Sequence, residues 1–263
     1  MKYRIPDPAD RVSVDSFIKE SPVDIASQEG FLDFCKKAIV RIGVFFKNQA
    51  AMSAYINENM KLFEDLNPKA IVKTVITRDL SLVANALTTI NEGLEKLRLG
   101  NKIDLMEFTS DALEKVGIVY ERGRISTARF QSGDWGEGKD KDGLDHPMVW
   151  NKTCEEFGWT TEAKRYAEKF IELSKTTSKG ELLAASNRHY TDVKNAMAKG
   201  LSRNMAIFDK EVAVDQINQL NICRDTLLKF YFKQLRAIMK GANIQPIGEV
   251  PAEITVVNSY QFK

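Results

Sequence analysis

The chain has 263 residues, of which 43% are hydrophobic and 28% charged, a composition typical of globular proteins that bury a core. Lys and Arg number 38 against 36 for Asp and Glu, which excludes a global attraction to nucleic acid or to an acidic surface. The three cysteines are odd in number and widely spaced, so they argue against a disulfide framework and indicate a reducing compartment.

Targeting segments are not expected. The basic residues that follow Met1 have no apolar run behind them, as a secretory signal would require. No stretch of about 18 uncharged apolar residues occurs, so a membrane-spanning helix is not expected either. We therefore expect a protein that is made in a cytoplasm and is soluble there.

Residues 1–29 are predicted to form an extended leader, or propeptide. They hold three of the seven prolines, Pro6, Pro8 and Pro22, and show no sustained hydrophobic period. A segment of this kind cannot bury itself unaided.

The most strongly amphipathic stretch follows the leader, between residues 31 and 47. Its hydrophobic side chains recur at helical spacing, which predicts a helix. They are Phe31, Phe34, Cys35, Ala38, Ile39, Ile42, Phe45 and Phe46. The opposite face is basic. It carries Lys36, Lys37, Arg41 and Lys47 with one acid, Asp33.

Two interpretations of this helix stay open. Its hydrophobic side can belong to the protein's own core, because each large apolar side chain that is buried contributes about 1.5–3 kcal/mol. A basic amphipathic helix can also lie on an anionic membrane or in a partner's groove. For that second interpretation the interaction face consists of Phe31, Phe34, Ile39, Ile42, Phe45 and Phe46.

The chain from residue 48 to residue 116 predicts further helices. Residues 48–66 have hydrophobic side chains three and four apart and end before a proline, which disfavours helix at the residue before it. Residues 69–99 predict a third helix. The β-branched run at 71–77 would also suit a short strand, but the continuing helical period favours helix. Gly100 is expected to end this helix, and 102–116 predicts a short one.

Residues 117–148 break the helical pattern. Stretches of strand composition alternate there with a polar loop that holds several glycines, so we expect a hairpin or a long excursion. Helical periodicity resumes at 150–157, 160–175, 180–208 and 210–239. A threonine side chain, Thr160 or Thr161, is expected to cap the second of these helices.

The predicted fold class is therefore mainly α, with a multi-helix, bundle-like body and a Gly/Trp-rich excursion that has room for a short β-hairpin. The regions are a leader at 1–29, an N-terminal helical region at 30–116, the excursion at 117–148, a C-terminal helical region at 149–241 and an extended tail at 242–263.

The sequence carries no catalytic or cofactor signature. Acidic residues in the loop at 134–145 suit calcium by type, but Gly138 and Val149 stand where an EF-hand has its first aspartate and its last glutamate. The two histidines, His146 and His189, have no cysteine or carboxylate at ligand spacing. Basic residues are scattered among acids, so no nucleic-acid groove is indicated. We expect no enzymatic activity, no metal and no cofactor.

The junction between the leader and the amphipathic stretch reads Ala26-Ser27-Gln28-Glu29-Gly30. It is similar to the Ser-x-Glu site after which the prohead protease of phiKZ-like giant bacteriophages cuts head proteins during maturation. The opening Gly30-Phe31-Leu32-Asp33-Phe34 resembles the mature start of internal head proteins in those phages. Those proteins also look like long helical chains without enzymatic motifs. The resemblance extends over residues 20–99.

The resemblance implies cleavage after Glu29, with Ser27 in a small protease pocket, Gln28 between them and Gly30 as the first residue of the product. Residues 1–29 would then direct packaging, and the mature protein would lie inside the virion head. Its partners would be the prohead protease and other head proteins. The packaged DNA would be a further partner, although the sequence indicates no basic groove for it. Ejection with the genome is a further expectation. The competing hypothesis is a helical adaptor or peripheral membrane-binding protein that acts through residues 31–47.

Overall fold

The computed structural model describes residues 28–74, 80–116, 119–121, 124–126, 137–139, 145–147, 150–175, 179–199 and 205–252. Most of these residues are helical, and the short strands among them pair only in antiparallel two-stranded sheets. The predicted mainly α fold class is therefore confirmed.

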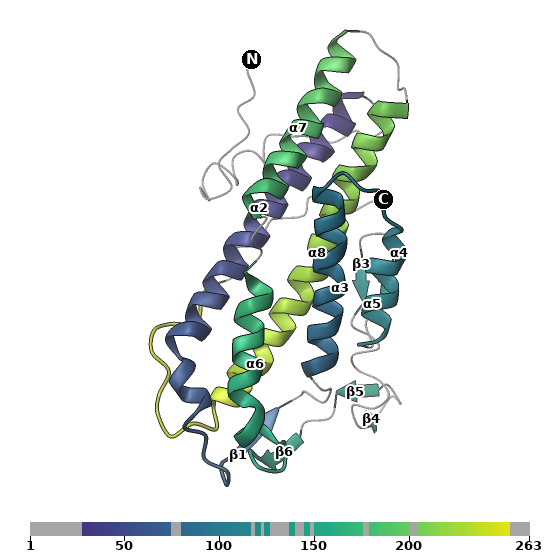
Figure 1. Ribbon diagram of the computed structural model, residues 1–263. Coiled ribbons are helices and arrows are strands. Elements are labelled where there is room, and N and C mark those ends of the chain that lie inside the picture. The colour runs from purple at the N-terminus through teal and green to yellow at the C-terminus, as the bar shows by residue number, and fades with distance from the viewer. Residues whose placement is uncertain are drawn as a thin grey trace.

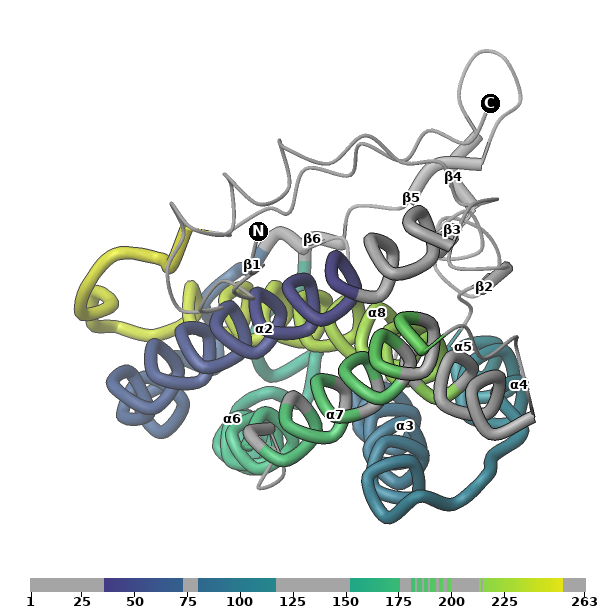
Figure 2. The backbone as a smooth tube through the Cα atoms, turned by 90° about the horizontal axis from the view of Figure 1, so that it is seen from above, coloured from purple at the N-terminus to yellow at the C-terminus, as the bar shows by residue number. Residues whose placement is uncertain are grey.

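The body is an elongated helical bundle (Figure 1). Its long helices are α2 (Gln28–Glu58), α3 (Leu80–Arg98), α6 (Trp159–Ser174), α7 (Lys179–Ala198) and α8 (Met205–Met239). Helix α8 contacts the other four, and the view from above places it among them (Figure 2). Helices α2 and α8 run in the same direction, whereas α6 and α7 follow one another along the side of the bundle in the opposite direction (Figure 1).

The hydrophobic pattern of α8 explains its central place. Residues 217, 220, 223, 224, 227, 228, 231, 235 and 238 are all fully buried, and they include the adjacent pair Leu227 and Leu228. A helix that is buried over more than one narrow stripe must be surrounded by other elements. A single hydrophobic core accordingly takes side chains from both predicted helical regions, from Ile42 on α2 to Met239 on α8.

Shorter elements close the ends of the bundle. The 3-10 helix η1 (Met60–Phe63) follows α2, and α4 (Leu105–Phe108) and α5 (Ser110–Glu114) pack beside α3. Strand β1 (Ile71–Thr74) pairs antiparallel with β6 (Trp150–Thr153), so that Ile71 lies opposite Thr153. In the excursion, β2 (Val119–Glu121) pairs with β3 (Arg124–Ser126), and β4 (Glu137–Lys139) pairs with β5 (Asp145–Pro147). Strands were expected in this excursion, and that prediction is confirmed.

Three predicted helices differ from the structure. The separate helix at 48–66 is wrong, because α2 continues to Glu58 and only η1 follows. The helix start at 69 and the helix at 150–157 are wrong, because β1 and β6 form there instead. Each of these two strands finds its hydrogen-bonding partner about 80 positions away in the chain, so no local pattern could show the pairing.

The predicted ends of two helices are confirmed, and one predicted cap is wrong. Gly100 adopts φ +82° after α3, and Gly241 follows the end of α8. Helix α6 starts after Gly158, at φ +69°, and no side chain caps it. The hydroxyl of Thr161 instead donates to the carbonyl of Gly158 at 3.3 Å. The expected acceptor role of Thr160 or Thr161 is therefore not found.

After α8 the chain turns back across the ends of α2 and α8 as an irregular segment, residues 242–252, which we name the C-terminal strap. The amide of Asn67 donates to the carbonyl of Gly241 at 2.9 Å. The side chain of Asn59, which is 1% exposed, makes two hydrogen bonds to Ile247: its Nδ2 donates to the carbonyl at 3.0 Å, and its Oδ1 accepts from the amide at 2.6 Å. The strap is therefore anchored at its middle to the end of α2.

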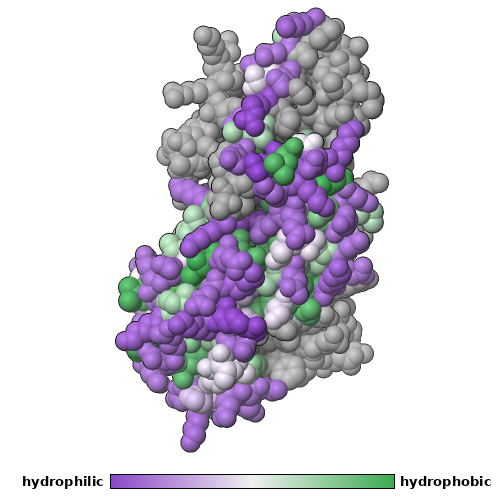
Figure 3. All heavy atoms as spheres, in the orientation of Figure 1, coloured by the Kyte–Doolittle hydropathy of each residue, from purple (hydrophilic) through white to green (hydrophobic). Residues whose placement is uncertain are grey.

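Hydrophilic side chains cover most of the described surface in the view of Figure 3, and hydrophobic residues show between them in separate patches. Within the described ranges, no helix combines the length and the hydrophobicity that a bilayer crossing requires.

Gly241 provides a test of the packing at the base of α8. A Cβ atom at this position would clash with Sγ of Cys154, which is fully buried. We expect Gly241→Ala to lower the free energy of unfolding by about 1–3 kcal/mol, as overpacking of a close-packed interior does. Urea denaturation measures the effect. Adding Cys154→Ala should restore part of the loss, and equal instability of the single and double variants would contradict the clash.

Candidate functional site

The predicted processing junction lies at the start of α2. Ser27 falls outside the described residues, whereas Gln28, Glu29 and Gly30 form the first turn of α2. The extended conformation expected up to Glu29 is therefore wrong for Gln28 and Glu29. The physical reason is that the amphipathic period, which begins at Phe31, is long enough to carry the helix two residues beyond the glycine.

The predicted interaction face lies mostly inside the bundle. Ile39 and Ile42 are fully buried, Phe46 is 5% exposed, and Phe45 is partly buried. Phe31 and Phe34 belong to α2, but their side chains lie outside the description. Of the two interpretations of this helix, burial in the protein's own core is the one observed for Ile39, Ile42 and Phe46.

The opposite side of α2 is also covered. Lys37 is 3% exposed, and Nζ of Lys36 lies 6.0 Å from the ring centre of Tyr190 on α7. Helix α2 contacts α6, α7 and α8, so over residues 36–58, whose side chains the structure describes, its basic side does not face solvent alone. Lys47 does stay exposed.

A polar centre that sequence reasoning missed lies in the middle of the bundle, around Arg224 of α8. Its side chain is fully buried and donates to three other helices. Nε donates to Oδ1 of Asn91 on α3 at 2.7 Å, and Nη1 donates to Oε1 of Gln49 on α2. Nη2 donates to the carbonyl of Leu173 at 2.9 Å and to that of Ser174 at 3.4 Å.

The last two contacts place the guanidinium at the carboxyl end of α6. The final carbonyls of a helix have no intrahelical partner, and a cation at that end also complements the helix dipole. Burial lowers the pKa of Arg224 to about 10, which is still far above neutral pH, so the group stays charged. Arg224 thus works as a charged cap for α6 and joins four helices.

Further polar side chains lie buried next to Arg224 along α8. Asn218 is 3% exposed and Asn221 fully buried, and Nδ2 of Asn221 donates to the carbonyl of Ile217 at 2.8 Å. Asp225 is 3% exposed, and its Oδ2 lies 2.6 Å from Nζ of Lys229. One face of the central helix is therefore polar inside the bundle, and these groups require specific partners to stay buried.

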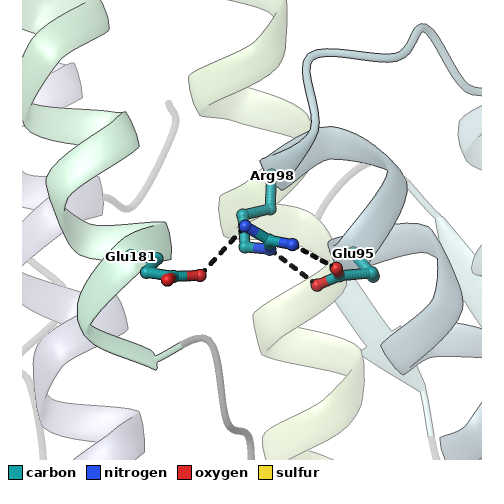
Figure 4. Close-up of polar contacts among 3 residues, drawn as sticks. All are labelled: Glu95, Arg98 and Glu181. Atoms are coloured by element: carbon teal, nitrogen blue, oxygen red, sulfur yellow. Dashed lines mark hydrogen bonds and ion pairs between the residues drawn. The ribbon is translucent and has the colours of Figure 1, made fainter.

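A second inter-helix contact lies at the carboxyl end of α3 (Figure 4). The guanidinium of Arg98 binds Glu95 within α3 and reaches across to Glu181 in the first turn of α7, where Nη1 lies 2.9 Å from the carboxylate. The hydrogen bond from Arg98 lowers the pKa of Glu95. Glu181 is exposed, and Arg98 and Glu95 are partly exposed, so this contact orients α7 against α3 more than it stabilises them.

The described side chains do not form a nucleophilic or metal-binding constellation. Burial raises the pKa of both the Cys154 and the Cys223 thiols, which keeps them protonated and unreactive. No group of three or more His, Cys, Asp or Glu residues suited to a metal occurs in the ranges described above. The side chains of His146 and His189 fall outside those ranges, so the sequence interpretation of both histidines stays a prediction.

No family model, curated protein or solved structure matches the chain. Its function must therefore be inferred from its own residues.

One signal in the sequence could have revealed Arg224. The buried hydrophobic positions of α8 recur at 217, 220, 227, 231, 235 and 238, and position 224 continues this period between 220 and 227. A charged residue at a position where a helix otherwise has buried hydrophobic residues must either reach solvent, which distorts the helix locally, or be buried with hydrogen-bonding partners. The partners Gln49, Asn91 and Leu173 are far away in the chain, so only the tertiary structure identifies them.

Removing the guanidinium should destabilise the bundle strongly. We expect Arg224→Met to lower the free energy of unfolding by about 3–5 kcal/mol, because it leaves Gln49, Asn91 and the end of α6 buried without their donor. Arg224→Lys should recover little, since one ammonium cannot donate in three directions. The matched control is Arg236→Met on an exposed turn of the same helix, with an expected change within about 0.5 kcal/mol. Equal urea midpoints for both Met variants would contradict the assignment.

Asp215 on α8 gives a pH-dependent test. Burial raises its pKa, against a hydrogen bond from Gln219 that lowers it. The charged form is therefore disfavoured in the folded state, and ionised Asp215 subtracts stability at neutral pH. We expect Asp215→Asn to raise the free energy of unfolding at pH 7. The advantage should shrink as the pH falls to about 3, where Asp is largely protonated in both states. A variant less stable than the parent at pH 7 would contradict the burial effect.

Proposed function

We propose that the protein is a non-enzymatic structural component of a bacteriophage head, made with a leader that the prohead protease removes by cutting after Glu29. The observation that carries the proposal is the place of Ser27-Gln28-Glu29, directly after the proline-bearing segment and at the amino-terminal end of α2, which includes Gln28 and Glu29. The mature protein would begin at Gly30 and lie with the genome inside the head.

The position of the junction in α2 supports this proposal. Gln28 and Glu29 belong to the first helical turn, whose amides have no partner within the helix. Terminal turns open at a cost close to zero, whereas the interior of a packed helix opens only with the surrounding structure. A protease that needs an extended substrate can therefore bind at this end of α2 without unfolding the bundle.

The placement of the core also supports it. The buried side chains that the structure describes on α2 lie between Lys37 and Ile56, and the main core cluster takes its α2 members from Ile42 onward. Cleavage after Glu29 would leave every residue of that core in the product. The polar centre at Arg224 and its partner Gln49 would also stay intact. The product would thus keep the fold of the precursor.

The buried polar side chains bind neighbouring parts of the fold to one another, and this fits a structural role. Arg224 donates to side-chain amides and main-chain carbonyls of three neighbouring helices, and Asn59 anchors the C-terminal strap. These groups serve to hold helices in place, which is what a protein packed at high density inside a particle requires.

Cleavage can be tested by expressing the full chain together with the prohead protease of a phiKZ-like phage. We expect a single cut, and the amino-terminal sequence of the product should start at Gly30. Glu29→Gln should abolish the cut, because it removes the charge at the residue before the scissile bond. Glu58→Gln at the opposite end of α2 is the matched control and should be cut as the parent is.

The protein recovered from purified phage particles should have the mass of residues 30–263. An intact amino terminus in the particle, or a cut elsewhere in the chain, would refute processing at Glu29. Absence of the protein from particles would refute the structural role itself.

A further inference from the structure

The last three turns of α8, together with Lys240 directly after it, carry a row of cations on one side. Lys229, Lys233, Arg236 and Lys240 follow one another at spacings of four, three and four, which places them on one face of the helix. From Lys233 to Lys240 the row extends about 10 Å along the axis. Lys233, Arg236 and Lys240 are all exposed.

This row borders two adjoining hollows between α2, α8 and the C-terminal strap. The first has a volume of about 240 Å³, and the second about 290 Å³. Arg236 and Val250 line both, so they stand at the boundary and the hollows form one groove. The first hollow has a hydrophobic floor of Met52 and Phe232 and a wall of Val250 and Pro251. We name the two together the strap groove.

The charge in the strap groove is unbalanced. Lys229 lies 2.6 Å from the carboxylate of Asp225, so its charge is partly neutralised. Lys233, Arg236 and Lys240 make no ion pair within the part of the chain that the structure describes. No carboxylate lines either hollow among those residues. Cations that converge on one cleft without a counter-charge favour a negatively charged ligand there.

The strap groove also has a built wall. The strap is fixed by the two hydrogen bonds between Asn59 and Ile247, so Val250 and Pro251 are held opposite α8. The floor is fixed as well, because Met52, Tyr55 and Phe232 are 6–7% exposed and the last two rings pack edge to face at 5.9 Å. A preformed concave surface with few charged groups at its rim is the usual form of a small-molecule site.

We propose that the strap groove binds a small organic anion, that is, a carboxylate or phosphate group on a short hydrophobic body. The anionic group would lie between Lys233 and Arg236, because these two exposed cations both line the first hollow. The hydrophobic body would cover Met52 and Val250. The arginine can donate to the anion through two N–H groups, and the lysine adds a point charge.

Two macromolecular ligands fit less well. Single-stranded nucleic acid binds by stacking bases on exposed aromatic rings, but Tyr55 and Phe232 are buried beneath the groove. A membrane surface binds hydrophobic side chains that protrude, and Ile244, Ile247 and Val250 of the strap are exposed, but the hydrophobic floor of the first hollow, Met52 and Phe232, lies below that surface. Binding to vesicles is therefore one of the outcomes of the test. Charge and shape together therefore favour a small anion. The inference does not depend on cleavage at Glu29.

The test uses the full chain and isothermal titration with octyl phosphate below its micelle concentration. We expect one site per chain. Octanol, which lacks the anion, and inorganic phosphate, which lacks the hydrophobic body, should each bind at least about tenfold more weakly. Octanoate distinguishes the two head groups: tighter binding of octanoate than of octyl phosphate assigns a carboxylate ligand, and the reverse assigns a phosphate.

Variants then locate the site. The double variant Lys233→Gln/Arg236→Gln should lose about tenfold or more in affinity, and Val250→Asp should lose at least as much because it places a negative charge between the hollows. The matched control is Lys115→Gln/Lys175→Gln, which removes two exposed cations elsewhere and should bind as the parent does. Thermal unfolding checks that each variant is folded.

Three results would overturn the proposal. The first is equal binding of octyl phosphate and octanol. The second is unchanged affinity in the folded Lys233→Gln/Arg236→Gln variant. The third is binding to anionic lipid vesicles or to single-stranded DNA with no binding of monomeric octyl phosphate or octanoate, which would assign the cations to a macromolecular surface.

Discussion

The arrangement of the bundle depends on the hydrogen bonds that the buried guanidinium of Arg224 makes to three other helices. This guanidinium is a fully buried charge that hydrogen-bonds to acceptors on three other helices, among them carbonyls at the carboxyl end of α6, and the neighbouring Asp225 adds a favourable charge. Removing such a charge from water is costly, and only a complete set of hydrogen bonds offsets that cost. Helices α2, α3 and α6 must therefore hold their positions along α8. A slip of one turn, about 5.4 Å, would break every one of these contacts.

These polar contacts explain why the helices adopt one register relative to each other, although hydrophobic packing alone specifies the register poorly. Leucine, isoleucine and phenylalanine side chains line all the long helices, and by themselves they would allow several registers between neighbours. Hydrogen bonds from Arg224 to Gln49 and Asn91 are satisfied in only one of them. The ion pair between Arg98 and Glu181, which is partly exposed, adds a weaker constraint on α7.

The two proposals concern opposite ends of the same pair of helices. The start of α2 carries the junction at Glu29, and its end carries Asn59, which holds the C-terminal strap against α8. The polar centre lies between them, so a cut at the first end leaves the groove at the second end intact. Processing and anion binding can therefore be measured separately on the same chain. A precursor and its product should differ in mass and share one ligand affinity.

By itself, the sequence determined the helical class, the presence of strands within residues 117–148, the end of α3 at Gly100 and the hydrophobic side of α8, because these follow from periodicity and local backbone preference. It also predicted a Ser-x-Glu processing junction, which stays a prediction, but not the helical conformation of Gln28 and Glu29. Only the tertiary structure decided that 71–74 and 150–153 pair as strands, that Ile39 and Ile42 face the protein's own core, and that Arg224 is buried. It alone brought the strap to the cations of α8. The reason is the same in each case: the deciding partner lies far away in the chain, and a local pattern records what a residue prefers but not which residue it meets.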